Sequence, residues 1–338
     1  MTTITSSGKE LSAMLVANPN LAIDRLVTLA EIVPGAVMRS RRTELSPGGK
    51  GVNVARVLRA HGVDVPLLGL LCEGDGALLA GLLADEGANL VAVATPGTVR
   101  QALVFREADA GRITVVNEPG DPVPAAAWTS YLDAAAVRLG ANDLLTVSGS
   151  LPTGVPVEGY RQLVELAHAR GAVIVVDAAP APLATALPAH PDLVCPNLEE
   201  AEAALSGAPV DVLPIPDGAD VRDRAEAAAQ ALVAAGAQRA AVTAGAAGTA
   251  FATAGTVSWI PAVPVEVVSP VGAGDSFVGG LALELLHHGP DAWRAAVVRG
   301  VATASASCET PLAGGVDPAR AEELRGKIEA LLDEVGAS

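Results

Sequence analysis

Aromatic residues are scarce in this sequence, because Phe, Trp and Tyr together make up 2% of its 338 residues. Proteins that bind single-stranded nucleic acid use aromatic side chains as stacking platforms, so this scarcity argues against such a partner. Basic residues are also in deficit: 22 lysines and arginines face 38 acidic residues, and the formal net charge is −16. A chain this acidic is repelled by a phosphate backbone. The composition therefore predicts no nucleic acid partner.

Cysteine is rare as well, and Cys72, Cys195 and Cys308 are far apart with no CxxC pair among them. An odd number at such spacing argues against a disulfide framework and a cysteine zinc site, and we expect the reducing cytoplasm. No run of about eighteen apolar residues is free of charge, glycine and proline, which predicts no membrane span. Residues 1–10 lack the basic start and apolar stretch of a signal peptide, and we expect them to be flexible.

The sequence is rich in short apolar runs of Val, Leu and Ile, and half of its residues are hydrophobic. Longer Ala/Leu-rich stretches with charges on one side separate these runs. The short runs predict buried strands at 67–71, 143–147, 173–176, 193–195 and 240–243. The longer stretches predict helices at 52–60, 77–86, 125–139, 157–169, 221–235, 275–288 and 291–307. This alternation predicts an α/β fold with a mostly parallel sheet, whose ligands bind at the carboxyl ends of the strands.

Two stretches interrupt the alternation. Residues 23–43 and 99–117 have near period-2 patterning with scattered charges, and segments 100–107 and 112–116 predict a β-hairpin. We expect the two stretches to form a small β-layer that projects from the main domain. The Pro/Gly-rich segment 209–219 is predicted to be a surface loop.

The first motif that carries chemistry is PGGKGVNVA at 47–55, which leads into a predicted helix. Glycines let the backbone approach a ligand closely, and a helix start offers free N–H groups and a positive dipole end. Lys50 adds a compact positive charge for an anion, and Asn53 can hydrogen-bond hydroxyls. The motif is not a Walker A loop, because Gly51 stands where Ser or Thr is required. An ordinary glycine turn with a solvated lysine is the alternative.

The second motif is VGAGDSFVGG, which opens a long apolar stretch. Gly272, Ala273 and Gly274 precede a predicted helix and form a nest of backbone N–H groups, suited to the charge on a transferred phosphoryl group. Asp275 beside this nest suits a general base that orients a hydroxyl, and a simple helix cap is the alternative. A dinucleotide-binding fingerprint is excluded, because Phe277 occupies the position of its third glycine.

The third motif is CPNLEE, at the end of a buried run. Asn197 and Glu200 lie three residues apart at a predicted helix start and share a face, where they could hold Mg²⁺ through waters. A capping box is the alternative, and these two residues taken alone favour it. Two further glycine-containing turns, at 148–152 and 243–248, follow predicted strands, where α/β folds place either ligand loops or ordinary turns.

Taken together and in this order, the motifs resemble the ribokinase/PfkB sugar kinases from about residue 15 to residue 312. GGKGVNVA, VSGSLP and GAGDS are similar to the hexose-phosphate branch, which contains 1-phosphofructokinase, tagatose-6-phosphate kinase and the minor 6-phosphofructokinase. The resemblance implies a ribokinase-like three-layer α/β/α fold with a mostly parallel central sheet and a small β-sheet lid. It also implies a single kinase domain over 11–338, a lid formed by about 20–46 and 97–120, and a homodimer through that lid.

The resemblance further implies roles for single residues, each at a position that matches a family motif. On the nucleotide side, the resemblance implies that Asp275 is the catalytic base and that Gly272, Ala273 and Gly274 form the anion hole. It implies that Asn197 and Glu200 hold magnesium. The ATP-binding residues would be Asn197, Thr243, Gly245 and Gly248. On the sugar side they are Asp24, Gly49, Lys50, Asn53 and Ser148, with Arg100 of the lid meeting the substrate phosphate.

The sequence departs from the branch pattern at four positions. Leu21 replaces a proline, and Ala102 replaces the asparagine of the lid's Arg-x-Asn element. Cys195 replaces a lysine that approaches the ATP phosphates, and Pro270 replaces a threonine before the second motif, which removes a hydroxyl and an N–H group. None of these departures touches the expected base or the anion nest, so they bear on the substrate more than on the reaction.

These observations predict an ATP- and Mg²⁺-dependent kinase that phosphorylates a sugar phosphate, with fructose 1-phosphate, converted to fructose 1,6-bisphosphate, as the first candidate substrate. Tagatose 6-phosphate, fructose 6-phosphate and an unphosphorylated sugar or nucleoside are the alternatives. A non-catalytic sugar- or nucleotide-binding regulator on a kinase fold is the alternative of another class. The sequence leaves activation by a monovalent cation open.

Overall fold

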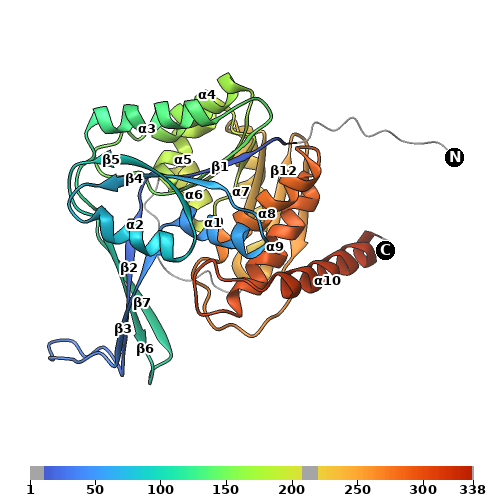
Figure 1. Ribbon diagram of the computed structural model, residues 1–338. Coiled ribbons are helices and arrows are strands. Elements are labelled where there is room, and N and C mark those ends of the chain that lie inside the picture. The colour runs from blue at the N-terminus through green and yellow to red at the C-terminus, as the bar shows by residue number, and fades with distance from the viewer. Residues whose placement is uncertain (1–10, 208–219, 337–338) are drawn as a thin grey trace.

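The structure is a computed structural model that describes residues 11–207 and 220–336. The flexible start expected at 1–10 and the surface loop expected at 209–219 lie outside these residues. The described chain forms a large sheet between two groups of helices, and a smaller sheet projects from this body (Figure 1).

The large sheet has nine strands in the described part of the chain. In spatial order they are β13 (Thr256–Pro261), β12 (Gly248–Thr253), β11 (Arg239–Thr243), β10 (Leu193–Val194), β9 (Val173–Ala178), β8 (Leu144–Gly149), β1 (Met14–Asn18), β4 (Pro66–Cys72) and β5 (Asn89–Thr95). Strands β11 to β5 pair in parallel, while β12 and β13 join antiparallel at one edge. The predicted mostly parallel sheet is confirmed, and each of the five predicted strands is present.

Helices cover both faces of this sheet, as the alternating pattern predicted. One face carries α3 (Ala125–Arg138), α4 (Gly159–Arg170), α5 (Pro180–Ala186), α6 (Leu198–Ser206) and α7 (Val221–Ala234). The other face carries α1 (Lys50–Ala60), α2 (Gly76–Asp85), α8 (Ala273–His288), α9 (Trp293–Cys308) and α10 (Pro318–Gly336). In β1, Leu15 packs toward the first group and Val16 toward the second, so both faces of the strand are buried. In the ranges that the structure describes, no helix is both long and apolar enough for a membrane span.

The smaller sheet, which we call the lid, contains β3 (Arg42–Gly48), β2 (Ala22–Leu29), β6 (Gln101–Glu107) and β7 (Arg112–Asn117) in that order. Strands β2 and β6 are parallel and the other pairs are antiparallel. The predicted hairpin is β6–β7, but the β-rich stretch predicted over 23–43 is strand only at its two ends. Pro34 and Gly35 lie between these ends, and proline cannot donate to a ladder.

Candidate active site

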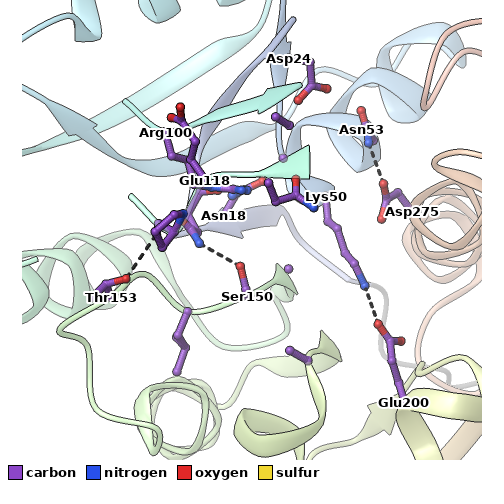
Figure 2. A pocket seen from close by; sticks show the side chains of 18 residues that line it. Asn18, Asp24, Lys50, Asn53, Arg100, Glu118, Ser150, Thr153, Glu200 and Asp275 are labelled. Atoms are coloured by element: carbon purple, nitrogen blue, oxygen red, sulfur yellow. Dashed lines mark hydrogen bonds and ion pairs between the residues drawn. The ribbon is translucent and has the colours of Figure 1, made fainter. Parts of the chain in front are cut away.

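A cavity of about 570 Å³, which we call the lid cavity, lies between the lid and the carboxyl edge of the large sheet (Figure 2). Lid residues such as Ala102 and Asn117 line one side, and Gly149, the last residue of β8, and the following Ser150 line the other. Seven residues singled out from the sequence line it together: Asp24, Gly49, Lys50, Asn53, Arg100, Glu200 and Asp275. The structure thus gathers residues from position 24 to position 275 of the chain around one space.

A second cavity of about 810 Å³, which we call the loop cavity, is lined mainly by loops that follow the strands. It brings together six more of the predicted residues: Asn197, Thr243, Gly245, Gly248, Ala273 and Gly274. Its remaining wall is largely apolar and includes Val263, Val265, Phe277 and Val301. An apolar slot beside backbone-rich glycine loops suits a flat heterocycle with attached phosphates.

The first turn of α8 separates the two cavities. Gly272 precedes this helix with φ 83, in the left-handed region, where glycine is unstrained and a side chain would also meet Ala313 at 2.9 Å. Ala273 and Gly274 line the loop cavity, whereas Asp275 lines the lid cavity. The unpaired N–H groups of a helix start favour an anion at this junction.

Asp275 is a buried carboxylate with one fixed neighbour. It is 6% exposed, and the side-chain amide of Asn53 donates to its Oδ2 over 2.6 Å (Figure 2). Burial raises the pKa of Asp275 above its usual value, while Lys50 and the hydrogen bond from Asn53 oppose that rise. The carboxylate is therefore both held in place and disposed to accept a proton.

Lys50 is held by two carboxylates on the far side of the cavity. Its Nζ lies 3.1 Å from Oδ1 of Asp177 and 3.4 Å from Oε1 of Glu200. Burial lowers the pKa of Lys50, but the charges of Asp177, Glu200 and Asp275 outweigh it and keep the ammonium protonated. Burial raises the pKa of Asp177 to about 7 against the opposing effect of Lys50. Lys50 is thus part of an ion-pair cluster.

Asp24 on β2 and Arg100 just before β6 also line the lid cavity. Burial raises the pKa of Asp24 to about 6, although Arg56 and Arg100 lower it. Position 48 has to be glycine for this carboxylate to fit, because a Cβ atom on Gly48 would lie 2.0 Å from Oδ1 of Asp24. Arg100 donates from Nη2 to the carbonyl of Asn20 over 3.2 Å, and its buried Nε has no partner among the described residues. A buried donor without a partner is costly, so this end is suited to receive an anion.

Asn197 and Glu200 form the capping box that their spacing favoured. Oδ1 of Asn197 accepts from the Glu200 N–H at 2.8 Å, and Oε2 of Glu200 accepts from the Asn197 N–H at 3.1 Å. Asn197 lines the loop cavity and Glu200 lines the lid cavity, so the pair lies where the two cavities approach each other.

This donor set fits Mg²⁺ held mainly through waters and ligand oxygens. The pair offers one carboxylate and one amide oxygen, which also close the capping box, and no group of three or more metal-binding side chains gathers anywhere in residues 11–207 and 220–336. Mg²⁺ keeps several waters and commonly binds one or two carboxylates together with substrate phosphates.

Ser148 is the one predicted sugar-side residue that the structure leaves out of the cavity. It is fully buried in β8, and its hydroxyl has no partner among the described residues. Ser150 lies at the lid cavity instead and accepts a hydrogen bond from Asn20 over 2.8 Å.

Two residues with clear structural roles at the site were missed from the sequence. Asn18 ends β1, and its Oδ1 accepts from the N–H groups of Gly51 and Val52, so it caps α1 from another element. Gly49 has φ 123, and a side chain on it would lie 2.6 Å from that same oxygen. Asp177, which binds Lys50, is the next-to-last residue of the buried strand β9. A polar residue directly after a buried apolar run was the available signal.

Three of the four departures from the branch pattern lie at the cavities or beside the ion-pair cluster. Ala102 lines the lid cavity and pairs in register with Asp24. Pro270 lines the loop cavity. Cys195 is buried, and burial raises the pKa of its thiol well above the usual value, with Asp177 adding to the rise, so it brings no charge. Leu21 is buried in the core.

Comparison with known proteins agrees with this geometry. Residues 18–320 match the model of the pfkB family carbohydrate kinases. The 1-phosphofructokinase of Xanthomonas campestris pv. campestris is 34% identical over 271 residues, which cover 79% of this chain and 82% of that protein. The 1-phosphofructokinase of Escherichia coli is also 34% identical, over 81% of this chain and 84% of its own length.

Solved structures show the same fold. Phosphofructokinase-2 of Escherichia coli in complex with potassium has a TM-score of 0.82 and 27% identity, covering 94% of this chain and 99% of that one. Ribokinase of Thermotoga maritima, at 20% identity, has a TM-score of 0.67 over 92% and 98% of the two chains. The predicted ribokinase-like α/β/α fold with a small β-sheet lid is therefore confirmed. From its sequence match and its structural neighbours alike, the chain belongs to the pfkB family of carbohydrate kinases.

Proposed function

We propose that this chain transfers the γ-phosphoryl group of ATP to the C6 hydroxyl of fructose 1-phosphate, giving fructose 1,6-bisphosphate and ADP. The observation that carries the proposal is the position of Asp275, Ala273 and Gly274 on one helix turn between two cavities. A hydroxyl in the lid cavity and a triphosphate in the loop cavity would meet at that turn. The 34% identical 1-phosphofructokinases support fructose 1-phosphate as the sugar.

The described residues would divide the chemistry as follows. Asp275 accepts the hydroxyl proton as the oxygen forms its bond to the γ-phosphorus and the bond to the ADP oxygen breaks. The N–H groups at the start of α8 meet the charge on the transferred group. Asp24 holds sugar hydroxyls, and Arg100 binds the phosphate that the sugar already carries. Bound Mg²⁺ would neutralise charge on the nucleotide phosphates, held by Glu200 and Asn197.

The proposal is tested by following ADP release with ATP, Mg²⁺ and a panel of acceptors: fructose 1-phosphate, fructose 6-phosphate, tagatose 6-phosphate and fructose. We expect kcat/KM for fructose 1-phosphate to exceed the others by at least about tenfold, because the fixed Arg100 favours one phosphate position. Potassium belongs in the assay, since a structural neighbour was solved with that ion. Sugar binding without turnover of any acceptor would favour the regulator instead.

Glu200→Gln should raise the Mg²⁺ concentration needed for half-maximal rate about tenfold, because a carboxylate is lost from the metal's surroundings. Glutamine can still close the capping box, so the start of α6 should stay intact. Glu202→Gln on the same helix is the matched control, because Glu202 pairs with Arg224 away from the junction. An unchanged magnesium dependence in Glu200→Gln would leave Glu200 with a capping role only.

We also propose that the enzyme acts in the cytoplasm, where its proposed substrates are metabolites.

We further propose that two copies pair through the lid. Val104 and Val115 extend the face of the lid that carries Ala102 and Asn117, and Val115 is 43% exposed. A second copy would cover this apolar row. Sedimentation at micromolar concentration should give a dimer, and Val115→Glu should shift it toward monomer. A wild-type protein that sediments only as monomer would contradict the pairing.

A further inference from the structure

Arg56 on α1 lies behind the lid cavity and lines neither cavity. It is 8% exposed, yet all of its donor nitrogens are engaged. Its Nε and Nη2 bind the two oxygens of Glu86, each over 3.0 Å, and Nη1 donates to Oδ1 of Asn53 over 2.6 Å. It also donates to the carbonyls of Pro47 and Ala313. A guanidinium bound this completely has one orientation.

This orientation decides which way the Asn53 amide faces. Arginine has donors and no acceptor, so the atom of Asn53 that contacts Arg56 is the oxygen. The amide nitrogen then faces Asp275 and donates to its Oδ2 over 2.6 Å (Figure 2). Among the described residues, Oδ1 of Asp275 has no hydrogen-bond partner from the protein and is left for a substrate hydroxyl.

We propose that Arg56, anchored by Glu86, is a positioning residue that fixes the Asn53 amide so that Asp275 keeps one oxygen turned to the reacting hydroxyl. The proposal deepens the kinase function proposed above and rests on it. Arg56 itself touches neither the sugar nor the nucleotide site. Its action passes through one side chain to the base, as an outer carboxylate orients a metal-bound or catalytic histidine.

We call the contacts from Arg56 through Asn53 to Asp275 the relay. If it operates, breaking it should change the pKa of Asp275 in a predictable direction. Charged groups face Asp275 from four elements: Lys50 and Arg56 on α1, Glu200 on α6, Asp177 on β9 and Asp24 on β2. Burial raises the pKa of Asp275, and the Asn53 hydrogen bond and the Arg56 charge are among the influences that lower it. Loss of Arg56 would free the amide to turn its oxygen to the carboxylate. The pKa of Asp275 would then rise, and the ionised base would be lost at a higher pH.

A purely structural role is the competing explanation, because Arg56 ties α1 to α2 and to the loop at Ala313. A variant of Arg59 distinguishes this structural role from the positioning role. It lies one turn further along α1 and contacts the same Glu86 carboxylate, over 3.5 Å. No hydrogen bond joins Arg59 to Asn53 in the described structure. Arg59→Met therefore removes a cation from the same carboxylate without touching the relay.

The test is a carbon-13 NMR titration of protein labelled at the aspartate carboxyl carbon. The Asp275 signal is identified by its absence from Asp275→Asn. Arg56→Met and Asn53→Ala should each raise the pKa of Asp275 by about one unit, since each removes the donor or the group that holds it. Arg59→Met should leave that pKa unchanged. In kinetics, Arg56→Met should lower kcat about tenfold or more, shift its acid limb to higher pH, and change the sugar KM little.

The double variant Arg56→Met/Asn53→Ala tests whether the effect passes through Asn53. Its pKa shift should fall clearly short of the sum of the two single shifts and exceed that of Asn53→Ala only by the direct effect of the Arg56 charge, because a relay has nothing to orient once the amide is gone. A shift equal to the sum of the two would mean that Arg56 acts only through space, and would overturn the proposal. An unshifted Asp275 in folded Arg56→Met would do the same.

Arg56→Lys covers the case in which Arg56→Met does not fold. Lysine keeps the buried charge, but one ammonium cannot replace a fork that binds Glu86 and Asn53 together. We expect the acid limb of kcat and the pKa of Asp275 to rise in this variant too, and wild-type values would refute the relay. The titration needs no substrate, so it judges the relay even if the acceptor panel refutes the kinase function.

Discussion

Asp275→Asn should lose at least about a thousandfold in kcat while keeping the fold and ATP binding, because only proton acceptance and orientation in the transition state are removed. Asparagine has the same shape and removes a charge from a site where burial already raises the pKa of the carboxyl. We therefore expect no loss of thermal stability. Steady-state and single-turnover assays measure the loss of phosphoryl transfer, calorimetry measures ATP binding, and a melting curve measures thermal stability.

Asp24→Asn is the matched control, because Asp24 is a second buried carboxylate of the same cavity, on lid strand β2 and not on α8. It should raise the KM of the sugar phosphate with a much smaller loss of kcat, since its proposed role is to hold hydroxyls. An Asp275→Asn enzyme that kept more than about a tenth of the wild-type kcat would remove Asp275 from the role of base.

Fold class was predictable because the strands of the large sheet are buried on both faces. All six residues of β8 are buried, and β9 is apolar except for Asp177, so a short apolar run flanked by turn residues marked each strand. Strand β5 was missed although residues 90–94 are all apolar; it is an edge strand of the sheet, and most of its side chains are only partly buried or exposed. The segment within 30–41 was wrongly included in the β-layer: Ile32, Val33 and Val37 are typical of strands, but the ladder stops where Pro34 and Gly35 follow.

The site was predictable where its chemistry is local in sequence. The helix starts at Gly49 and Gly272 need glycine for their own backbone conformation, so each motif carried its own signal. Lys50 and Asp177 are 127 residues apart, and nothing in the local pattern of either residue indicates the other. The choice between Ser148 and Ser150 depends on the residue at which β8 ends, which is the least certain feature of a strand pattern.

Arg100→Ala should raise the KM for the sugar phosphate by about ten- to a hundredfold, the loss of a charge-assisted bond of about 1.5–3 kcal/mol, with little change in the KM for ATP. Its buried Nε lacks a partner in the described structure, and its guanidinium lines the lid cavity beside Asp24. Arg41→Ala is the control, because Arg41 pairs with Asp109 at an exposed part of the lid, outside the cavity.

From the sequence, Lys50 was expected on the sugar side as a positive charge for an anion, a role that the substrate phosphate would fill, and its surroundings now favour a different result. To grip a substrate phosphate, its ammonium would have to leave Asp177 or Glu200. We therefore expect Lys50→Met to lower kcat and change the magnesium dependence, with less effect on the sugar KM than Arg100→Ala. Asp177, whose pKa burial already raises to about 7, would take up a proton in the lysine's absence, which limits the loss of stability.

The two variants together decide the branch of the family to which the substrate belongs. A large rise in sugar KM in both would return Lys50 to the substrate phosphate and keep the hexose-phosphate assignment. A rise in Arg100→Ala only would keep that assignment and place Lys50 on the side of phosphoryl transfer. If neither variant affects the sugar KM and an unphosphorylated sugar is the better acceptor, the lid cavity does not bind a phosphate group of the substrate. The alanine at position 102 would then mark a ribokinase-like specificity, because it replaces the asparagine of the lid's Arg-x-Asn element.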